Sequence, residues 1–269
     1  MAFLYQGFAT VYDRLMSDVP YAKFAAVFDA VVQRSGDAPV SVIDLGCGTG
    51  AMFPHLLRRA SRVIGVDASE EMLARAALRT NGDPRVSLLQ QRAEQFRIPG
   101  QTEWCVSFCD VLNYMEDDEA LRQAFRSVYR ALRPGGHFLF DLLSRRYLEM
   151  SVGSGAYFEV DDDAAYLMQS TWDAHTQSVS YDLVVFARES GRCYARYDER
   201  HVQRAFAEHR VREALAEAGF VDVAVGGDVA SLASGEFKAD LPSGEQPDRW
   251  FFLARRPGLA SGDRSMPSE

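Results

Sequence analysis

Short apolar runs alternate with helical patterns through the first half of the chain. Each run has the length and composition of a buried strand, and the segments between the runs repeat apolar residues at helical spacing. The clearest helix is expected at 117–132, behind Asp117 as N-cap. Such alternation predicts a parallel sheet covered by helices. The expected strands lie at 42–45, 63–67, 86–89, 105–108 and 137–142.

The pattern changes after Ser144, where the chain becomes rich in aromatic and β-branched residues. Three such runs lie at about 166–172, 178–188 and 192–202, and turn residues separate them. Runs of this kind at short intervals predict antiparallel strands. We therefore expect an antiparallel sheet inserted after the fifth strand of the first half.

Helices and strands are also expected on both sides of these two halves. Residues 8–34 carry apolar and aromatic side chains at helical spacing before and after Pro20, which predicts two short helices. These helices are expected to lie over a bound ligand. The remaining expected elements are a helix at 207–218, closing strands at 221–225 and 250–254, and a polar loop at 226–248.

The turn after the first predicted strand carries an acid and three alternate glycines. Asp44 is followed by Gly46, Gly48 and Gly50, and glycine lets the backbone take positive φ and pass close to a ligand. Dinucleotide-binding turns favour G-x-G-x-x-G, whereas here the third glycine comes one residue earlier. A carboxylate at Asp44 suits a ligand with a cationic amino group and would repel a pyrophosphate.

This turn resembles the first motif of the class I S-adenosylmethionine (SAM) dependent methyltransferases, and three later motifs follow in the family's order. Asp67 ends the second strand. The segment 105–114 resembles the family's fourth strand and the loop after it, and 132–136 resembles its L-x-P-G-G signature. The resemblance extends over about residues 8–256.

The resemblance implies an α/β fold, a Rossmann-like seven-stranded methyltransferase sheet with an inserted antiparallel β cap. The chain has 269 residues, of which 47% are hydrophobic, and this is enough apolar surface for a large core. The expected organisation is a SAM-binding core with N-terminal lid helices (1–155), the inserted cap (156–204), the C-terminal part of the core (205–256) and a disordered tail (257–269).

The resemblance also implies which residues hold SAM as the cofactor. In the family, the acid at the position of Asp67 accepts both ribose hydroxyls, and an acid after the third strand meets the adenine amino group. Here Arg92 stands in place of that second acid, and Gln91 and the backbone at Ala93 can still serve. The expected cofactor-binding residues are Tyr12, Tyr21, Asp44, Gly46, Gly48, Gly50, Asp67, Ala68, Gln91, Arg92, Ala93, Cys109, Asp110 and Asn113.

Methyl transfer requires the protein mainly to align the acceptor, the methyl carbon and the sulfur. Methyl transfer from a sulfonium is an in-line displacement, so no nucleophilic side chain is required. A hydroxyl acceptor would need a general base, for which His201 is the best candidate, whereas an unprotonated amine would need none. A solvated strand end is the alternative interpretation of His201. The expected catalytic residues are His201, Asp110 and Tyr12, with helix capping and core packing as the alternatives for the last two.

Composition limits the partners and the compartment. A net charge of −9 disfavours an extended phosphate-binding face, so we expect a small-molecule acceptor rather than a nucleic acid. The four cysteines lack metal-binding spacing, which predicts reduced thiols and no metal site. The N-terminus lacks a signal-peptide pattern and no apolar run approaches a membrane span, so we expect a cytoplasmic protein without membrane contact. No particular oligomeric state is predicted.

Three functional interpretations are open at this point. The favoured one is SAM-dependent methyl transfer to a nitrogen or oxygen of a small molecule, with the inserted strands over the acceptor. An RNA or protein methyltransferase is the alternative among enzymes, and a basic strip beside the site would favour it. A non-catalytic SAM-binding regulatory protein is the third, which Arg92 at the adenine-contact position keeps open.

Overall fold

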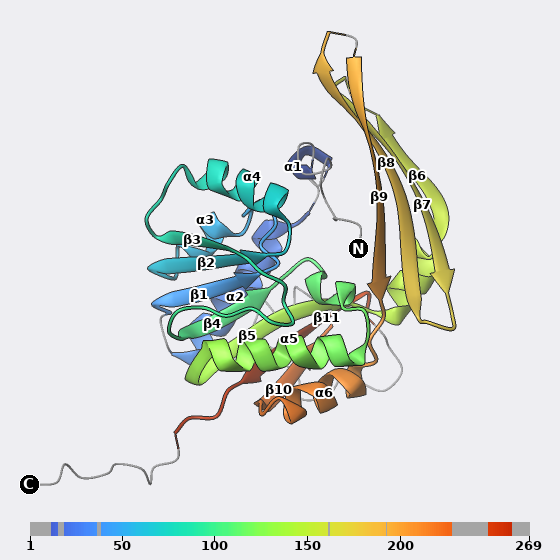
Figure 1. Cartoon of the computed structure of the whole chain (residues 1–269). Helices are drawn as coiled ribbons and strands as arrows, with labels where there is room; N and C mark the ends of the chain where they lie inside the picture. Colours follow the sequence, from blue (N-terminus) through green and yellow to red (C-terminus); the bar gives the residue numbers. More distant parts are fainter. Residues whose placement is uncertain are drawn as a thin grey trace, which may run out of the picture.

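The computed structural model shows a mixed sheet flanked by helices, with a second sheet standing beside it (Figure 1). The expected tail, apart from its first three residues, and most of the expected polar loop lie outside the described part of the chain. The structure describes residues 12–15, 19–36, 39–160, 162–191, 193–227 and 247–259.

The central sheet consists of β1 (Ser41–Leu45), β2 (Arg62–Asp67), β3 (Val86–Gln90), β4 (Thr102–Ser107), β5 (Leu132–Leu143), β10 (Val221–Gly226) and β11 (Arg249–Arg255). Their order is β10-β11-β5-β4-β1-β2-β3. The strands from β1 to β5 pair in parallel, and β11 is antiparallel to both β5 and β10. The predicted seven-stranded, Rossmann-like sheet is therefore confirmed.

Helices cover both faces of this sheet, because alternate residues of each buried strand point to opposite sides. Val42 of β1 packs with α2, α3 and α4, whereas Ile43 packs with α5 and α6. Ser69 and Asp117 cap α4 and α5 by accepting from backbone N–H groups. The helices are α1 (Tyr12–Leu15), α2 (Tyr21–Ser35), α3 (Phe53–Leu56), α4 (Glu70–Thr80), α5 (Asp118–Ala131) and α6 (Glu208–Glu217).

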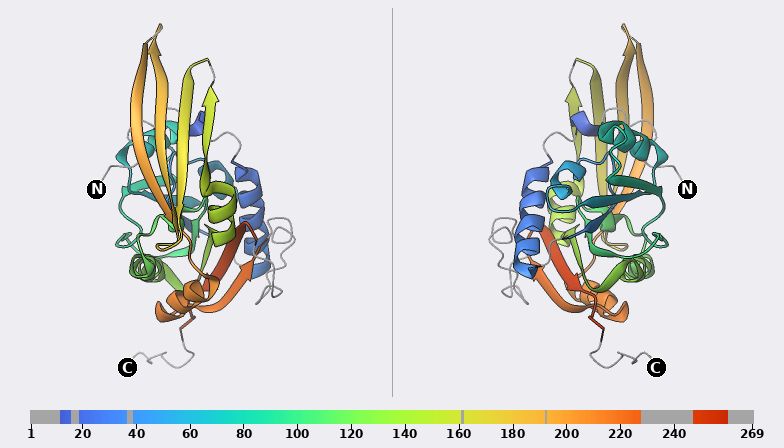
Figure 2. Two further views of the ribbon diagram at one scale, coloured as in Figure 1. Left: turned by 90° about the vertical axis from the view of Figure 1, so that its right-hand side faces the viewer. Right: turned by 90° about the vertical axis from the view of Figure 1, so that its left-hand side faces the viewer.

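The inserted sheet has the order β6-β7-β8-β9 and is antiparallel throughout. It leaves the core after β5 and returns before α6, as predicted (Figures 1 and 2). Its inner face buries Leu183 and Val185, and Tyr12 of α1 packs on this cluster. The strands are β6 (Ser154–Val160), β7 (Ala164–Asp173), β8 (Ser178–Ser190) and β9 (Cys193–Arg204).

One local expectation was wrong, and two elements were missed. α2 is not short but runs for 15 residues, because its buried apolar positions continue from Phe24 to Val32 and pack on the sheet. The insertion begins with a π-helical turn, η3 (Tyr147–Val152), and with β6, neither of which was predicted. β6 alternates less clearly than its neighbours, since Phe158 and Val160 on it are exposed.

Candidate active site

The glycine turn after β1 combines tight packing with an open space. Gly46 has φ +73°, and a Cβ there would overlap the side chain of Val111, which follows β4. Gly48 has φ +52°, and no heavy atom of the described residues lies within 4 Å of the position that its Cβ would take. Gly46 is therefore required by the fold, whereas Gly48 leaves room where a ligand would lie.

Asp44 is a buried acid with an unsatisfied oxygen. Its residue is 3% exposed, and no described group donates to Oδ2. Burial, and then the charge of Asp67, raise the pKa of Asp44 to about 7. A cationic amino group placed beside this carboxylate would supply the missing partner and favour its ionised form.

Asp67 is fixed at the end of β2 by two backbone donors. Its Oδ2 accepts from the N–H of Gly48 at 2.8 Å, and its Oδ1 accepts from that of Ser69 at 2.9 Å. Each carboxylate oxygen has a further lone pair. The unsatisfied oxygen of Asp44 therefore fits the amino group of SAM. The carboxylate of Asp67, beside the open space at Gly48, fits the ribose hydroxyls.

The loop after β3 holds the residues expected at the adenine end. The amide of Gln91 is occupied, because Nε2 donates to the carbonyl of Arg97 at 2.9 Å and Oε1 accepts from its N–H at 2.8 Å. The N–H of Gln91 donates to the carbonyl of Asp67, while Ala68 is exposed and Ala93 is half-buried. Gln91 thus shapes this loop through its own backbone partners.

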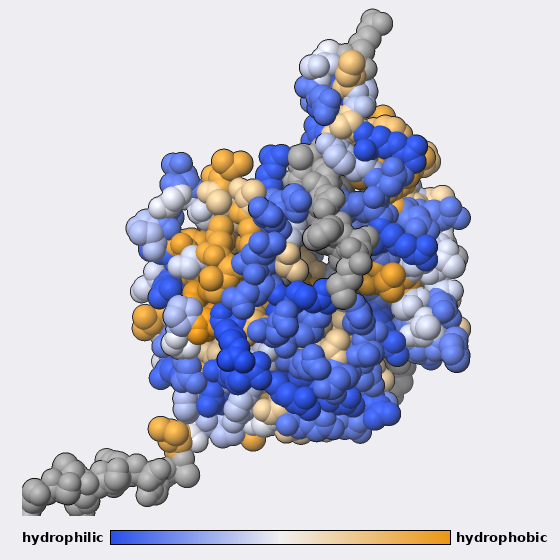
Figure 3. Space-filling model, viewed as in Figure 1, coloured by the Kyte–Doolittle hydropathy of each residue, from blue (hydrophilic) through white to orange (hydrophobic). Residues whose placement is uncertain are grey.

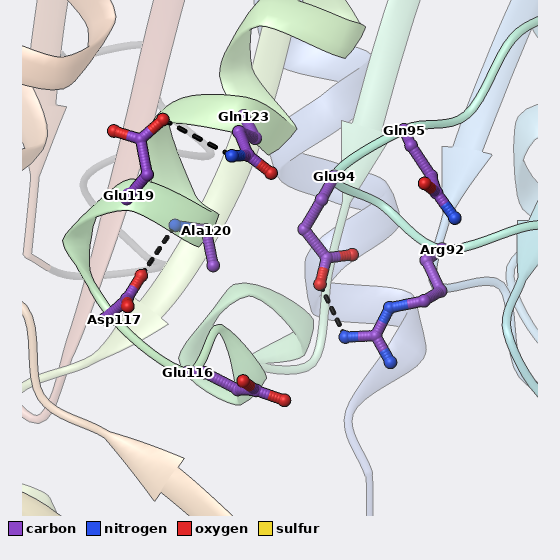
Figure 4. A pocket seen from close by; sticks show the side chains of 8 residues that line it. All are labelled: Arg92, Glu94, Gln95, Glu116, Asp117, Glu119, Ala120 and Gln123. Atoms are coloured by element: carbon purple, nitrogen blue, oxygen red, sulfur yellow. Dashed lines mark hydrogen bonds and ion pairs between the residues drawn. The ribbon is translucent and has the colours of Figure 1, made fainter. Parts of the chain in front are cut away.

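Arg92 lies in a surface hollow of about 310 Å³ between the loop after β3 and the start of α5 (Figure 4). Its guanidinium donates to Glu94 at 2.6 Å. The side chain is therefore paired in this outer hollow, where Asp117 caps α5. The lining residues are Arg92, Glu94, Gln95, Glu116, Asp117, Glu119, Ala120 and Gln123.

Asp110 is held from two sides in the loop after β4. Cys109 and Asp110 both have positive φ, +65° and +55°, so this loop turns sharply. Asp110 Oδ1 accepts from Arg249 of β11 at 3.0 Å, and Oδ2 accepts from Gln203 of β9 at 2.6 Å. Both carboxylate oxygens of Asp110 are thus engaged, one by the core and one by the inserted sheet.

A fully buried acid, Asp141, lies next to Asp110 and Arg249. Asp141 of β5 is 0% exposed, forms an ion pair with Arg249 and accepts from the N–H of Asp110 at 3.1 Å. Burial raises the pKa of Asp141 to about 6, although Arg249 opposes that shift. Arg249 also lies over the ring of Phe24, 5.5 Å from its centroid. One guanidinium therefore joins α2, β5 and the loop after β4.

Asn113 ties the inserted sheet to the core. In the 3₁₀ turn η2 (Val111–Tyr114), the buried Asn113 donates through Nδ2 to the carbonyls of Leu143 at 3.2 Å and Arg204 at 2.8 Å. Its Oδ1 accepts from the N–H of Leu143 at 2.9 Å. These contacts occupy the amide that was expected to meet the cofactor.

Tyrosine side chains gather where the core, α1 and the inserted sheet meet. Burial, followed by interaction with Tyr21, Cys109 and Tyr114, raises the pKa of Tyr12 well above its ordinary value. Burial likewise raises the pKa values of Tyr21 and Tyr181. These phenols remain neutral near pH 7 and can act as hydrogen-bond donors, as Tyr181 does to Gln203 at 2.7 Å.

The short helix α1 connects the glycine turn with the inserted sheet (Figure 1). Asp13 accepts from Thr49 of the turn and pairs with Arg79 of α4. The next residue, Arg14, lies 3.5 Å from Asp163 beside β7. The helix therefore lies between the glycine turn and the inserted sheet.

His201 is buried in the inserted sheet, and a solvated strand end is excluded. Its Nε2 lies 2.9 Å from Glu199 Oε2, and the two side chains are 6% and 4% exposed. Its Nδ1 lies 3.4 Å from the hydroxyl of Tyr114. The sequence analysis missed Glu199, although its position two residues before His201 on a strand places both on one face. Tyr114 lies in the segment 105–114 that carries the resemblance but was given no role, and Arg249 was missed because no local signal connects it with the site.

Two features are absent from the described part of the chain. No group of three His, Cys, Asp or Glu side chains there could hold a metal ion. No helix there is long and apolar enough to cross a membrane.

Comparison with known proteins identifies relatives along nearly the whole chain. Residues 42–136 match the sequence model of a methyltransferase domain. The chain is 33% identical to YqeM of Bacillus subtilis (strain 168), named as a candidate methyltransferase, over 94% of this chain and 97% of YqeM. The crystal structure of a SAM-dependent methyltransferase from Clostridium acetobutylicum superposes with a TM-score of 0.79 at 25% identity, covering 94% of this chain and 99% of that one.

A second solved structure shows the same fold. DesVI of Streptomyces venezuelae superposes with a TM-score of 0.71 at 22% identity, over 93% of this chain and 98% of that one. Together with a turn that fits SAM, these matches establish the enzyme class and its cofactor. The chain therefore belongs to the class I SAM-dependent methyltransferases.

Proposed function

We propose that this enzyme transfers a methyl group to a nitrogen or oxygen atom of a small molecule held between the inserted sheet and the core. The contact between β9 and the loop after β4 carries the proposal. Gln203 reaches Asp110 and His201 reaches Tyr114, so the inserted sheet covers the acceptor side of the cofactor site. A covered site suits a small acceptor better than a macromolecular surface.

Relatives matched over part of the chain support this size class. One is named ubiquinone biosynthesis O-methyltransferase in Pseudomonas aeruginosa (strain UCBPP-PA14), 27% identical over 59% of this chain and 67% of its own. Another is named dTDP-3-amino-3,4,6-trideoxy-alpha-D-glucopyranose N,N-dimethyltransferase in Streptomyces venezuelae, 30% identical over 43% of this chain and 47% of its own. Their names describe small acceptors, one methylated on oxygen and one on nitrogen.

Each part of the site has a proposed role. When bound, SAM supplies a methyl group activated by a sulfonium. Asp44, Gly48 and Asp67 would hold its amino group and ribose, and Tyr12 would lie beside the sulfonium, whose charge an aromatic face attracts. His201 is the proposed general base. Asp110 is a positioning residue, because a carboxylate that already accepts from a guanidinium and an amide is a poor base.

A macromolecular acceptor is the weaker candidate. Hydrophilic residues cover the front of the molecule over α5 (Figure 3), but two arginines of α5 are paired with acids. Arg122 lies 2.9 Å from Glu217, and Arg126 lies 3.3 Å from Glu119. Paired cations offer little to a phosphate backbone. The four free thiols, with Cys193 exposed, favour a reducing compartment, and we propose the cytoplasm.

The proposal is tested by locating the transferred methyl group. Purified protein is incubated with methyl-labelled SAM and a cell extract, and the products are separated into small molecules, RNA and protein. We expect label among the small molecules, and its absence with an Asp67→Ala control of impaired cofactor binding. Label confined to RNA or protein would refute the proposal.

A further inference from the structure

We propose that the acceptor atom is the oxygen of an alcohol or phenol, and that Tyr114, His201 and Glu199 form a chain that removes its hydrogen. This inference rests on the small-molecule methyl transfer proposed above. It goes beyond a single candidate base, because it assigns a role to three residues and names the acceptor class.

Glu199 and His201 form a buried pair at one end of the proposed chain. Both side chains point to the inner face of β9, are more than nine-tenths buried, and approach to 2.9 Å at Nε2. In the proposed chain Glu199 is ionised and can only accept, so Nε2 of His201 carries the hydrogen. Nδ1 of the neutral ring is then a lone-pair acceptor, and Glu199 stabilises the imidazolium that forms when Nδ1 takes a proton.

Tyr114 is the member of the proposed chain next to His201. It ends η2, directly after the loop that holds Cys109 and Asp110, and its hydroxyl lies 3.4 Å from Nδ1 of His201. Tyr114, Cys109 and Asp110 all contribute to the raised pKa of Tyr12, so these groups belong to one cluster. In the proposed chain, Tyr114 is the member that follows the loop of Asp110, and His201 comes next.

The other titratable groups of this cluster are poorly suited to act as the base. Asp110 has both oxygens engaged by Arg249 and Gln203. Burial raises the pKa values of the Cys109 thiol and of the Tyr12 and Tyr181 phenols, so these groups keep their hydrogens near pH 7. The proposal therefore assigns the role of base to His201, whose two ring nitrogens lie beside Glu199 and Tyr114.

The acceptor class follows from the chemistry that such a chain serves. An amine can attack as its free base, whereas a hydroxyl must lose its hydrogen as the new bond forms. Placing a carboxylate and an imidazole together in a buried sheet costs desolvation free energy, which a proton-accepting role explains. The chain therefore favours an oxygen acceptor.

The step balances without another reactant. The acceptor oxygen forms a bond to the methyl carbon, and the carbon–sulfur bond breaks with its electron pair remaining on sulfur. The acceptor's hydrogen passes to the hydroxyl oxygen of Tyr114, whose own hydrogen passes to Nδ1 of His201. The products are a methyl ether, a neutral thioether and an imidazolium, which later releases its proton to solvent.

The atom that receives the methyl group is the first test. With SAM carrying a ¹³C methyl group, the ¹³C chemical shift of the small-molecule product distinguishes O–CH₃ from N–CH₃. We expect O–CH₃. An N–CH₃ product would overturn this inference and leave the proposed function intact, whereas label in RNA or protein would overturn both.

Variants give the second test. Tyr114→Phe and His201→Gln should each slow turnover by ~10²-fold while SAM affinity, measured by calorimetry, stays within a few-fold. Glu199→Gln should slow turnover and alter the pH–rate profile, since Glu199 acts through His201. His175→Ala, in an exposed turn, is the control and should leave turnover unchanged. Full turnover in Tyr114→Phe and His201→Gln would overturn the inference.

A readout independent of turnover covers the case in which a variant fails to fold. The ¹⁵N spectrum of the wild-type protein reports which ring nitrogen of His201 carries the hydrogen. We expect hydrogen on Nε2 and a lone pair on Nδ1 near neutral pH. Hydrogen on Nδ1 would overturn the proposed direction of transfer.

Discussion

Gly46 and Gly48 stand two residues apart in one turn, yet their missing side chains matter for different reasons. At Gly46 a methyl group would collide with Val111, which belongs to the loop that carries Asp110. At Gly48 it would enter open space beside Asp67, where the ribose of SAM is expected. The same glycine pattern therefore serves packing at one position and leaves space for the proposed ligand at the other.

A pair of alanine variants separates these two roles. Gly48→Ala should weaken SAM binding at least tenfold, because its methyl group occupies the ligand space, and should cost only the ~1–2 kcal/mol of a left-handed alanine in stability. Gly46→Ala carries the same backbone strain plus the overlap with Val111, so it should lose more unfolding free energy. Calorimetry and urea unfolding measure both quantities. Equal losses of stability would contradict this assignment.

At the scale of elements, the joint between the two sheets depends on Arg249. This residue starts β11 and pairs with Asp110 and Asp141, while Gln203 of β9 binds the opposite oxygen of Asp110. Removing the guanidinium would leave a buried acid, Asp141, without its cation. Arg249 would also no longer hold Asp110, the residue to which Gln203 of the inserted sheet donates.

Arg249→Met should therefore lower the free energy of unfolding by ~3 kcal/mol or more, as expected when one partner of a buried ion pair is removed. Arg255→Met is a matched control, because Arg255 lies on the same strand and pairs with the exposed Asp222. The control should change stability by ~1 kcal/mol or less. Amide exchange at residues 109–114 should rise only in Arg249→Met, and equal effects of both variants would contradict the role of this joint.

The elements that the sequence predicted well are those with a local signal. The strands of the core are short apolar runs, and the caps Ser69 and Asp117 precede their helices directly. Contacts across the chain carried no such signal. Arg249 meets Asp110 from 139 positions away, and Asn113 meets Arg204 from 91. Chain folding, rather than spacing, brings these groups together.

At the scale of the whole molecule, the cofactor-free protein carries buried acids whose ionisation opposes folding. Burial raises the pKa of Asp44 to about 7 and that of Asp141 to about 6. The folded state therefore holds protons that the unfolded chain has lost above about pH 4, and the contribution of these acids to stability falls as pH rises from about 4 to about 7. In its proposed place beside Asp44, bound SAM would reverse this effect by pairing its amino group with the carboxylate.

Asp44→Asn, which cannot ionise, should consequently gain unfolding free energy relative to the wild type as pH rises from 5 to 7.5, by a few kcal/mol at most. Wild-type SAM affinity should rise over the same range, and that of the variant should rise less. Asp83→Asn is the control, because Asp83 is half-buried and its hydrogen bonds with Arg85 lower its pKa to about 2, outside this range. A difference between Asp44→Asn and the wild type that is independent of pH would show that Asp44 does not titrate there.

Asn113 has a consequence for how such an enzyme can diversify. Its single amide holds the carbonyls of Leu143 and Arg204, where the insertion leaves and rejoins the core, so these two points lie side by side. An insertion whose two ends lie side by side can be replaced without moving the strand and the helix that flank it. Its sequence can drift, or the whole segment can be exchanged, while the glycine turn stays unchanged. Under the proposed role of the insertion, new acceptor specificities are expected to arise there, as long as the contacts of Gln203 with Asp110 and of His201 with Tyr114 are kept.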